Sequence, residues 1–230
     1  MIDWNKIDTV LLDMDGTLLD LHFDTYFWLH HLPMRYAQIH GLDLEGAKHK
    51  IHSLIGQLEG SLQWYCFDHW SNMLGLDIVA LKHEVTHKVQ IRPFVTDFLI
   101  RLRDHKKKLI LITNSHPKGL AIKLDITAID QYLDVIISSH EFNTPKEDMS
   151  FWTQLITQEK FDRERTLFID DTPRVLRRAK DFGIAHLVCI TSPDSQKEPK
   201  ASNEFIDADH FDKIMPEPVC ASTTTHPNND

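Results

Sequence analysis

The chain alternates between short, continuous apolar runs and longer segments whose apolar residues recur at helical spacing. Apolar runs of four or so residues, bounded by polar or turn residues, are typical of strands buried on both faces. Helical segments between such strands favour a parallel sheet. We therefore expect an α/β fold, with a Rossmann-like parallel sheet, helices on both faces and an inserted all-helical cap. The expected strands are residues 9–12, 109–112, 135–137, 166–169 and, last in the series, 187–190.

The helical pattern is densest between the first strand and Pro93. Apolar spacing predicts a helix over 44–58 and another over 64–73, which Gly75 should end. Pro33 should kink, break or end the first helix of this region. We divide the chain into an α/β core of residues 1–17 and 90–215, a helical cap of residues 18–89 and a disordered tail of residues 216–230.

Composition fits a soluble globular protein, with 42% hydrophobic and 26% charged residues. The formal net charge of −9 disfavours a broad face for nucleic acid polymers, because neutralising phosphates requires clustered Lys and Arg. It leaves room for one small phosphorylated ligand in a local basic pocket. Charge says nothing about oligomeric state, which stays open.

Cysteine usage and the first residues bear on localisation. Cys66, Cys189 and Cys220 are widely spaced, and an odd count without a pairing pattern fits a reducing compartment. The first ten residues lack the basic and apolar regions of a signal peptide, and no apolar run approaches the ~20 residues that span a bilayer. We expect a cytoplasmic protein with no membrane association.

Polar residues follow each of four expected strands. In a parallel sheet all of them would lie at one edge, where such sheets bind ligands. The carboxylates would form a hard oxygen site suited to Mg²⁺, and a hydroxyl, an amide and an ammonium would bind phosphate oxygens. One carboxylate could attack phosphorus, and another could transfer protons. The residues are Asp13, Asp15, Thr113, Asn114, Lys146, Asp170 and Asp171.

The motifs that hold these residues resemble the haloacid-dehalogenase-like hydrolase superfamily. They are DMDGT at 13–17, TNSHP at 113–117, PKED at 145–148 and TLFIDDT at 166–172. Together with QWYC at 63–66, they are most similar to the GMP/IMP 5′-nucleotidases of that superfamily. The position of residues 18–89 also corresponds to that of the superfamily's helical cap.

The resemblance implies a role for each matching residue. Asp13 would be the nucleophile and a metal ligand. Asp15 would be the general acid and base, with its backbone carbonyl on the metal. Asp170 would bind the metal through its side chain, supported by Asp171. The phosphoryl group would be bound by Asp13, Met14, Asp15, Thr113, Asn114 and Lys146, and Lys146 would also neutralise its charge.

Three other features admit a functional interpretation. Residues 83–87 match H-E-x-x-H, but 15 histidines and 34 acidic residues make a chance match easy, and no third ligand follows at a usual spacing. We therefore expect the end of a cap helix there and not a zinc site. His116 either contacts substrate or belongs to the first turn of the next helix. The cap aromatics should mostly pack in the cap, with one or two free to stack on a purine.

We expect a Mg²⁺-dependent phosphomonoesterase that hydrolyses GMP and IMP through an aspartyl-phosphate. A sugar-phosphate phosphatase or a phosphomutase on the same scaffold is the alternative. A dehalogenase would leave Asp15 and the acid pair unexplained. A non-catalytic binding module is a remote alternative, because it would have no need for all of Asp13, Asp15, Lys146 and Asp170.

Overall fold

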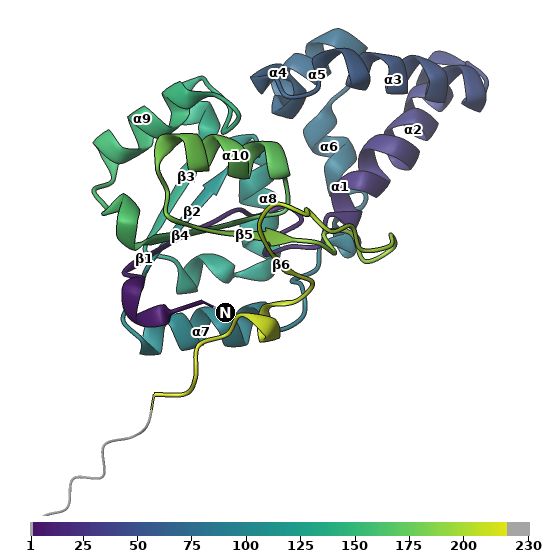
Figure 1. The fold of residues 1–230 in the computed structure, drawn as a ribbon. Helices are drawn as coiled ribbons and strands as arrows, with labels where there is room; N and C mark the ends of the chain where they lie inside the picture. Colours follow the sequence, from purple (N-terminus) through teal and green to yellow (C-terminus); the bar gives the residue numbers. More distant parts are fainter. Residues whose placement is uncertain (1, 220–230) are drawn as a thin grey trace, which may run out of the picture.

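The computed structural model describes residues 2–219, which form a six-stranded sheet with helices around it and a helical region to one side (Figure 1). Every strand pair is parallel, in the order β3-β2-β1-β4-β5-β6. The Rossmann-like α/β fold expected from the sequence is confirmed. The strands are β1 (Thr9–Leu12), β2 (Lys108–Thr113), β3 (Val135–Ser138), β4 (Thr166–Asp170), β5 (His186–Ile190) and β6 (Ile206–Ala208).

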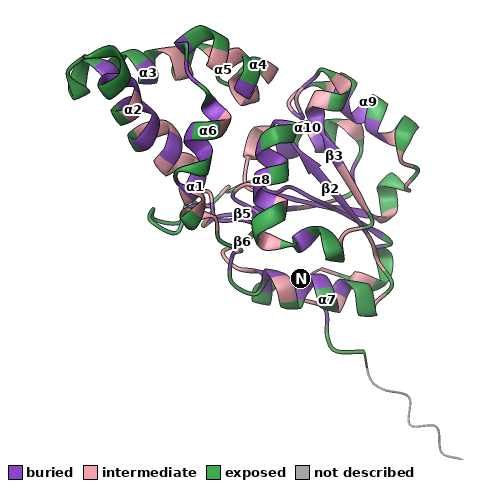
Figure 2. Ribbon diagram, turned by 180° about the vertical axis from the view of Figure 1, so that it is seen from behind, coloured by how far each residue is buried: buried purple, intermediate pink, exposed green. Residues whose placement is uncertain are grey.

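Different helices cover the two faces of the sheet, because successive strand residues point to opposite sides. Val10 and Leu12 pack in one apolar cluster with α7 and α8, whereas Leu11 packs in another with α9 and α10. Figure 2 shows the buried residues along the strands and the exposed ones on the outer faces of the helices. These helices are α7 (Val95–Asp104), α8 (Pro117–Thr127), α9 (Met149–Gln158) and α10 (Pro173–Phe182).

The residues between β1 and α7 form a helical region with its own apolar core around Phe27, Ile51 and Trp70. Aspartate side chains cap the start of two of its helices: Asp43 accepts the N–H of Gly46, and Asp77 accepts that of Ala80. We call this region the cap. Its helices are α1 (His22–Tyr26), α2 (Leu32–His40), α3 (Leu44–Leu58), α4 (Leu62–Tyr65), α5 (Phe67–Leu74) and α6 (Ile78–His83).

The structure corrects three expectations. Pro33 does not end a helix: it lies in the first turn of α2, just after a π-helical stretch at Phe27–His31 that joins α1 to α2. The single helix expected over 64–73 is two, because Cys66 adopts an extended backbone between α4 and α5. The strand at 187–190 is not the last, since β6 pairs with its outer edge.

The chain returns from the cap to the core at Arg92, whose buried guanidinium bonds four backbone carbonyls. It donates to Gly16 and Thr17 in the turn after β1, and to Ser192 and Asp209 beyond β5. One side chain therefore ties the turn that leads into the cap to the C-terminal part of the core.

The tail expected at 216–230 lies outside the described residues from position 220 onward. Before that point Pro216 is buried, and its carbonyl accepts a hydrogen bond from Arg101. No helix within residues 2–219 is both long enough and apolar enough to span a membrane.

We predict that Arg92→Ala lowers the free energy of unfolding by about 3 kcal/mol or more, because it leaves four carbonyls without a charged donor. Urea unfolding followed by circular dichroism measures this. Arg103→Ala is the matched control, since Arg103 is exposed, donates to the Tyr132 carbonyl and lies 3.9 Å from the exposed carboxylate of Asp134. Equal losses in the two variants would contradict the role given to Arg92.

Candidate active site

The strand register brings the polar residues after β1, β2 and β4 to one edge of the sheet. Leu12 pairs with Leu111 on one side and with Ile169 on the other. Asp13 continues this register, because its backbone N–H donates to the Ile169 carbonyl at 3.0 Å. Asp170 follows Ile169 and is therefore level with Asp13 in the sheet. Thr113 ends β2 two residues after Leu111, at the same edge.

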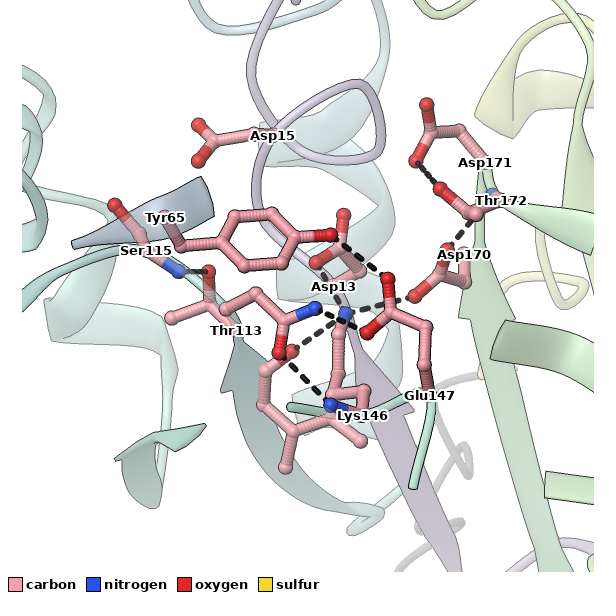
Figure 3. A network of polar contacts seen from close by, with 12 residues as sticks. Asp13, Asp15, Tyr65, Thr113, Ser115, Lys146, Glu147, Asp170, Asp171 and Thr172 are labelled. Carbon is pink, nitrogen blue, oxygen red and sulfur yellow. Dashed lines mark hydrogen bonds and ion pairs between the residues drawn. The ribbon is translucent and has the colours of Figure 1, made fainter. Parts of the chain in front are cut away.

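Lys146 lies at the centre of this edge (Figure 3). Its ammonium is 2.5 Å from Asp13 Oδ1 and 2.8 Å from Asp170 Oδ2, and it also donates to the Ile112 carbonyl. All three charged side chains are buried. Burial raises the pKa of Asp13 to about 6 despite Lys146, and the two carboxylates raise the pKa of Lys146 although burial opposes this.

Asp171 completes an acidic cluster with Asp13 and Asp170, whose carboxylate oxygens lie within 4.8 Å of one another. Burial, together with these two neighbours, raises the pKa of Asp171 well above its usual value. Three carboxylates this close together form an oxygen donor set that suits a hard cation. The cluster depends on Gly16, which has a φ of 87° and where a Cβ would lie 2.5 Å from Asp171 Oδ2.

Asn114 and Thr113 bond within the site. Asn114 Oδ1 accepts the backbone N–H of Lys146, and its Nδ2 donates to Glu147 Oε2, so this side chain holds the loop that carries Lys146. Thr113 Oγ1 accepts the N–H of Ser115. Met14 has a fully buried side chain in the core, so only its backbone can face a ligand.

The side chain of Asp15 belongs to a different cluster from that of Asp13 (Figure 3). Asp15 Oδ1 is 2.6 Å from the Lys123 ammonium, which is 2.7 Å from Asp24 of the cap. Asp24 also contacts Lys82, a buried lysine on α6. Burial raises the pKa of Asp15 to about 6 against the effect of Lys123, whereas the two lysines lower the pKa of Asp24 although burial opposes them.

A cavity of about 260 Å³ lies between cap and core, with Asp15 and Lys123 in its wall. Most of its lining is aromatic or aliphatic, and most of that comes from the cap. It therefore offers an apolar volume beside a carboxylate whose pKa is about 6. The aromatic lining residues are Trp28, Trp64, Tyr65, Phe67, Trp70 and His116.

Two polar contacts connect the cap to the core near α4. The Tyr65 hydroxyl donates to Glu147 Oε1 at 2.9 Å, and Arg174 on α10 lies 3.1 Å from the same oxygen. Arg174 also contacts Glu59 of the cap at 3.3 Å. Glu147 therefore joins a cap tyrosine, a core arginine and Asn114.

Sequence reasoning did not single out Lys123, Asp24, Lys82, Glu147 or Arg174. Lys123 lies on the apolar face of α8, next to Leu120 and Leu124. A lysine among the apolar positions of an amphipathic helix indicates a buried charge, so this residue could have been found from the sequence. Glu147 follows Lys146 directly, within a motif already marked. No local pattern connects Asp24 or Lys82 with the site.

The structure also places the two ambiguous histidine features. His116 begins α8, where its Nδ1 accepts the N–H of Lys118, and its ring lines the cavity. Both interpretations of His116 are thus compatible with its position. The H-E-x-x-H stretch is not one helix face, since α6 ends at His83 and Glu84 pairs with His31 and Arg35.

Known proteins resemble this chain in sequence and in fold. A family model described as haloacid dehalogenase-like hydrolase matches residues 10–189. The GMP/IMP nucleotidase YrfG of Escherichia coli K12 is 39% identical over 215 residues, which cover 94% of this chain and 97% of the relative, and the Shigella flexneri protein of that name gives the same values. The crystal structure of a HAD phosphatase from Thermococcus onnurineus superimposes with a TM-score of 0.77 at 22% identity, covering 90% of this chain and 96% of that one.

We predict that Lys146→Met destabilises the fold most at alkaline pH. The variant leaves Asp13 and Asp170 buried without their counter-ion, which should cost roughly 3–5 kcal/mol at pH 8. Burial raises the pKa of both carboxyls in the folded state. Below pH 6 the folded variant therefore binds protons that the unfolded chain does not, and protonation removes the uncompensated charge. The loss of unfolding free energy should thus shrink toward pH 5.

Urea unfolding in EDTA at both pH values measures this effect. Lys118→Met is the control, because the Lys118 ammonium is exposed and pairs with exposed Asp68. An equal loss for Lys146→Met at pH 8 and pH 5 would argue against uncompensated carboxylates as its cause.

Proposed function

The chain belongs to the haloacid dehalogenase-like hydrolase family, and from this premise we propose that it is a Mg²⁺-dependent phosphomonoesterase acting on purine nucleoside 5′-monophosphates, GMP and IMP. One observation carries the proposal: the buried group of Asp13, Lys146 and Asp170 adjoins an aromatic cavity that has Asp15 in its wall. The E. coli relative, named a GMP/IMP nucleotidase, supports the choice of substrate.

Asp13 is the nucleophile in the proposed reaction. Its carboxylate attacks phosphorus in line with the leaving nucleoside oxygen, and an aspartyl-phosphate forms. The Lys146 ammonium, 2.5 Å from Asp13, keeps this carboxylate ionised and faces the negative charge of the transferring group. The buried floor of the site excludes bulk water from the nucleophile.

Asp15 transfers the proton. With a pKa of about 6 it can be protonated to donate to the leaving oxygen, and then as a carboxylate it can deprotonate the water that hydrolyses the aspartyl-phosphate. Its side chain must turn from Lys123 toward the substrate to do so. Lys123 is a positioning residue in this scheme, because it holds Asp15 and the cap residue Asp24 together.

The residues at the strand ends fit a bound Mg²⁺. Asp13 and Asp170 would hold the ion, with the backbone carbonyl of Asp15 as the family resemblance implies and with Asp171 in support. Asp13, Asp170 and Asp171 lie close together, and the pKa of Asp171 is strongly raised. Both observations favour such an ion, since the negative charge of three carboxylates exceeds the single positive charge of Lys146. When bound, Mg²⁺ would neutralise charge on the transferring phosphoryl group.

The apolar cavity is the proposed site of the purine. Trp64 and Tyr65 belong to α4 at the cap edge nearest Glu147, and Trp28 comes from the π-helical stretch. A flat, polarisable base suits such a lining better than a sugar, which would need more hydrogen-bonding groups. This composition favours a nucleotide over the sugar phosphates of the alternative activities.

A panel of phosphate esters tests the activity. We expect phosphate release from GMP and IMP with Mg²⁺, none after chelation with EDTA, and slower release from AMP and hexose phosphates. Faster hydrolysis of hexose phosphates would overturn the substrate and leave the chemistry standing. Conversion of a hexose 1-phosphate to the 6-phosphate would instead indicate a mutase.

We predict that Asp13→Asn lowers kcat by about 10⁴-fold or more, because the amide cannot attack phosphorus to form the aspartyl-phosphate. Circular dichroism should show a folded protein, since Asn can still accept a hydrogen bond from Lys146. Retained turnover of a generic aryl phosphate by this variant would exclude Asp13 as the nucleophile.

We predict that Trp64→Leu raises KM for GMP roughly tenfold, because stacking of a base on an aromatic ring contributes about 1–3 kcal/mol. KM for glycerol phosphate, which has no base, should change little. Trp4→Leu is the matched control: Trp4 packs against Phe98 of α7, away from the cavity. An unchanged KM for GMP would place the base elsewhere.

A further inference from the structure

A second cluster of metal-binding side chains lies at the junction of cap and core. Cys66 begins α5 in the cap, His116 begins α8 in the core, and His140 lies in the 3₁₀ turn Ser139–Phe142 after β3. One ligand atom from each of the three residues lies within 4.8 Å of the others. The phosphatase mechanism proposed above uses neither Cys66 nor His140.

His140 offers a buried ring nitrogen to this cluster. Its Nε2 has no hydrogen-bond partner among the described residues. When the ring proton is on Nδ1, Nε2 has a lone pair that can bind a metal ion.

His116 is held in place on both sides. Its ring stacks on Phe67 at a centroid distance of 5.3 Å, and the His140 ring meets it edge-on at 5.0 Å. Burial lowers the pKa of His116 below its usual value and that of His140 to about 4. Nδ1 of His116 accepts the Lys118 N–H and Nε2 lies 3.6 Å from Asp68 Oδ2, so a bound ion would either take the place of that N–H at Nδ1 or bind Nε2 once the ring proton is on Nδ1.

Cys66 brings a sulfur ligand from the cap. Its Sγ accepts the N–H of His69 at 3.5 Å, in the first turn of α5. The extended backbone of Cys66, which separates α4 from α5, places this sulfur near the two histidines.

We propose that Cys66, His116 and His140 form a binding site for a borderline-soft divalent cation such as Zn²⁺, distinct from the carboxylate site. One sulfur and two imidazole nitrogens favour Zn²⁺ over Mg²⁺, which prefers oxygen. Three protein ligands leave a fourth position for water. The thiol proton passes to solvent on binding, because the thiolate is the ligand.

The geometry needs only a small contraction. Ligand atoms of a tetrahedral zinc site, with bonds of about 2.0–2.3 Å, lie about 3.5 Å apart, so atoms that now lie within 4.8 Å of one another would draw together by at most about 1.3 Å. Since Cys66 belongs to the cap and both histidines to the core, a bound ion would tie the two together. His116 also lines the cavity, so zinc would slow substrate exchange and lower turnover.

Calorimetric titration of the full-length protein with Zn²⁺, in excess Mg²⁺ to occupy the carboxylates, tests the site without reference to activity. We expect one ion per chain, and an affinity at least about tenfold lower in Cys66→Ser and in His140→Gln. Serine keeps the helix cap that Cys66 provides. His49→Gln is the matched control, because His49 is exposed on α3 and should bind as the wild type does.

Titration with Co²⁺ adds a spectroscopic test of the sulfur ligand. The wild type should develop a near-ultraviolet thiolate-to-cobalt charge-transfer band, and Cys66→Ser should lack it. Wild-type affinity for Zn²⁺ in Cys66→Ser, or a cobalt spectrum without the thiolate band, would overturn the proposal. These measurements are independent of turnover, so they stand or fall separately from the phosphatase assignment.

Discussion

The site depends on the compensation of buried carboxylates by buried ammonium groups. Asp13 and Asp170 share Lys146, whereas Asp15 shares Lys123 with Asp24. Asp13 and Asp15 are only two residues apart, yet each has its own lysine from a different part of the fold. Both carboxyls have a pKa of about 6, but their surroundings differ: Asp13 faces the other acids, and Asp15 faces the cap cavity. Different surroundings are what a nucleophile and a proton donor require.

The second of these pairs also connects the site to the cap. Lys123 reaches Asp24, and Asp24 reaches Lys82, which lies over the rings of Phe23 and Phe27. Glu147 makes a similar connection through Tyr65, directly beside the loop that carries Lys146. Movement of the cap would therefore alter the partners of Asp15 and of Glu147 together. In the proposed enzyme this couples substrate entry to the position of the proton donor.

Local patterns predicted much of the fold because they depend on burial alone. The strands around Asp13 are continuous apolar runs, and they appear where expected since both faces of the sheet are covered. β6 was missed because its three residues include an exposed Ile206 and no apolar run. The start of α7 shows the same limit: Phe94 stands at helical spacing from the buried Phe98, but it precedes the helix with a φ of 64° and is 47% exposed. Its neighbours in sequence could not reveal that the helix begins one residue later.

The sequence by itself determined the α/β class, the series of strands and the collection of acids, hydroxyl, amide and lysine at one edge, because strand direction alone brings those residues together. It could not determine which lysine compensates which acid, since Lys123 lies more than a hundred residues from Asp15 and looks like part of an amphipathic helix. Nor could it bring Cys66 to the two histidines. Charge pairing and metal coordination act over a few ångströms in space, and only the packing of the cap against the core decides which residues come that close.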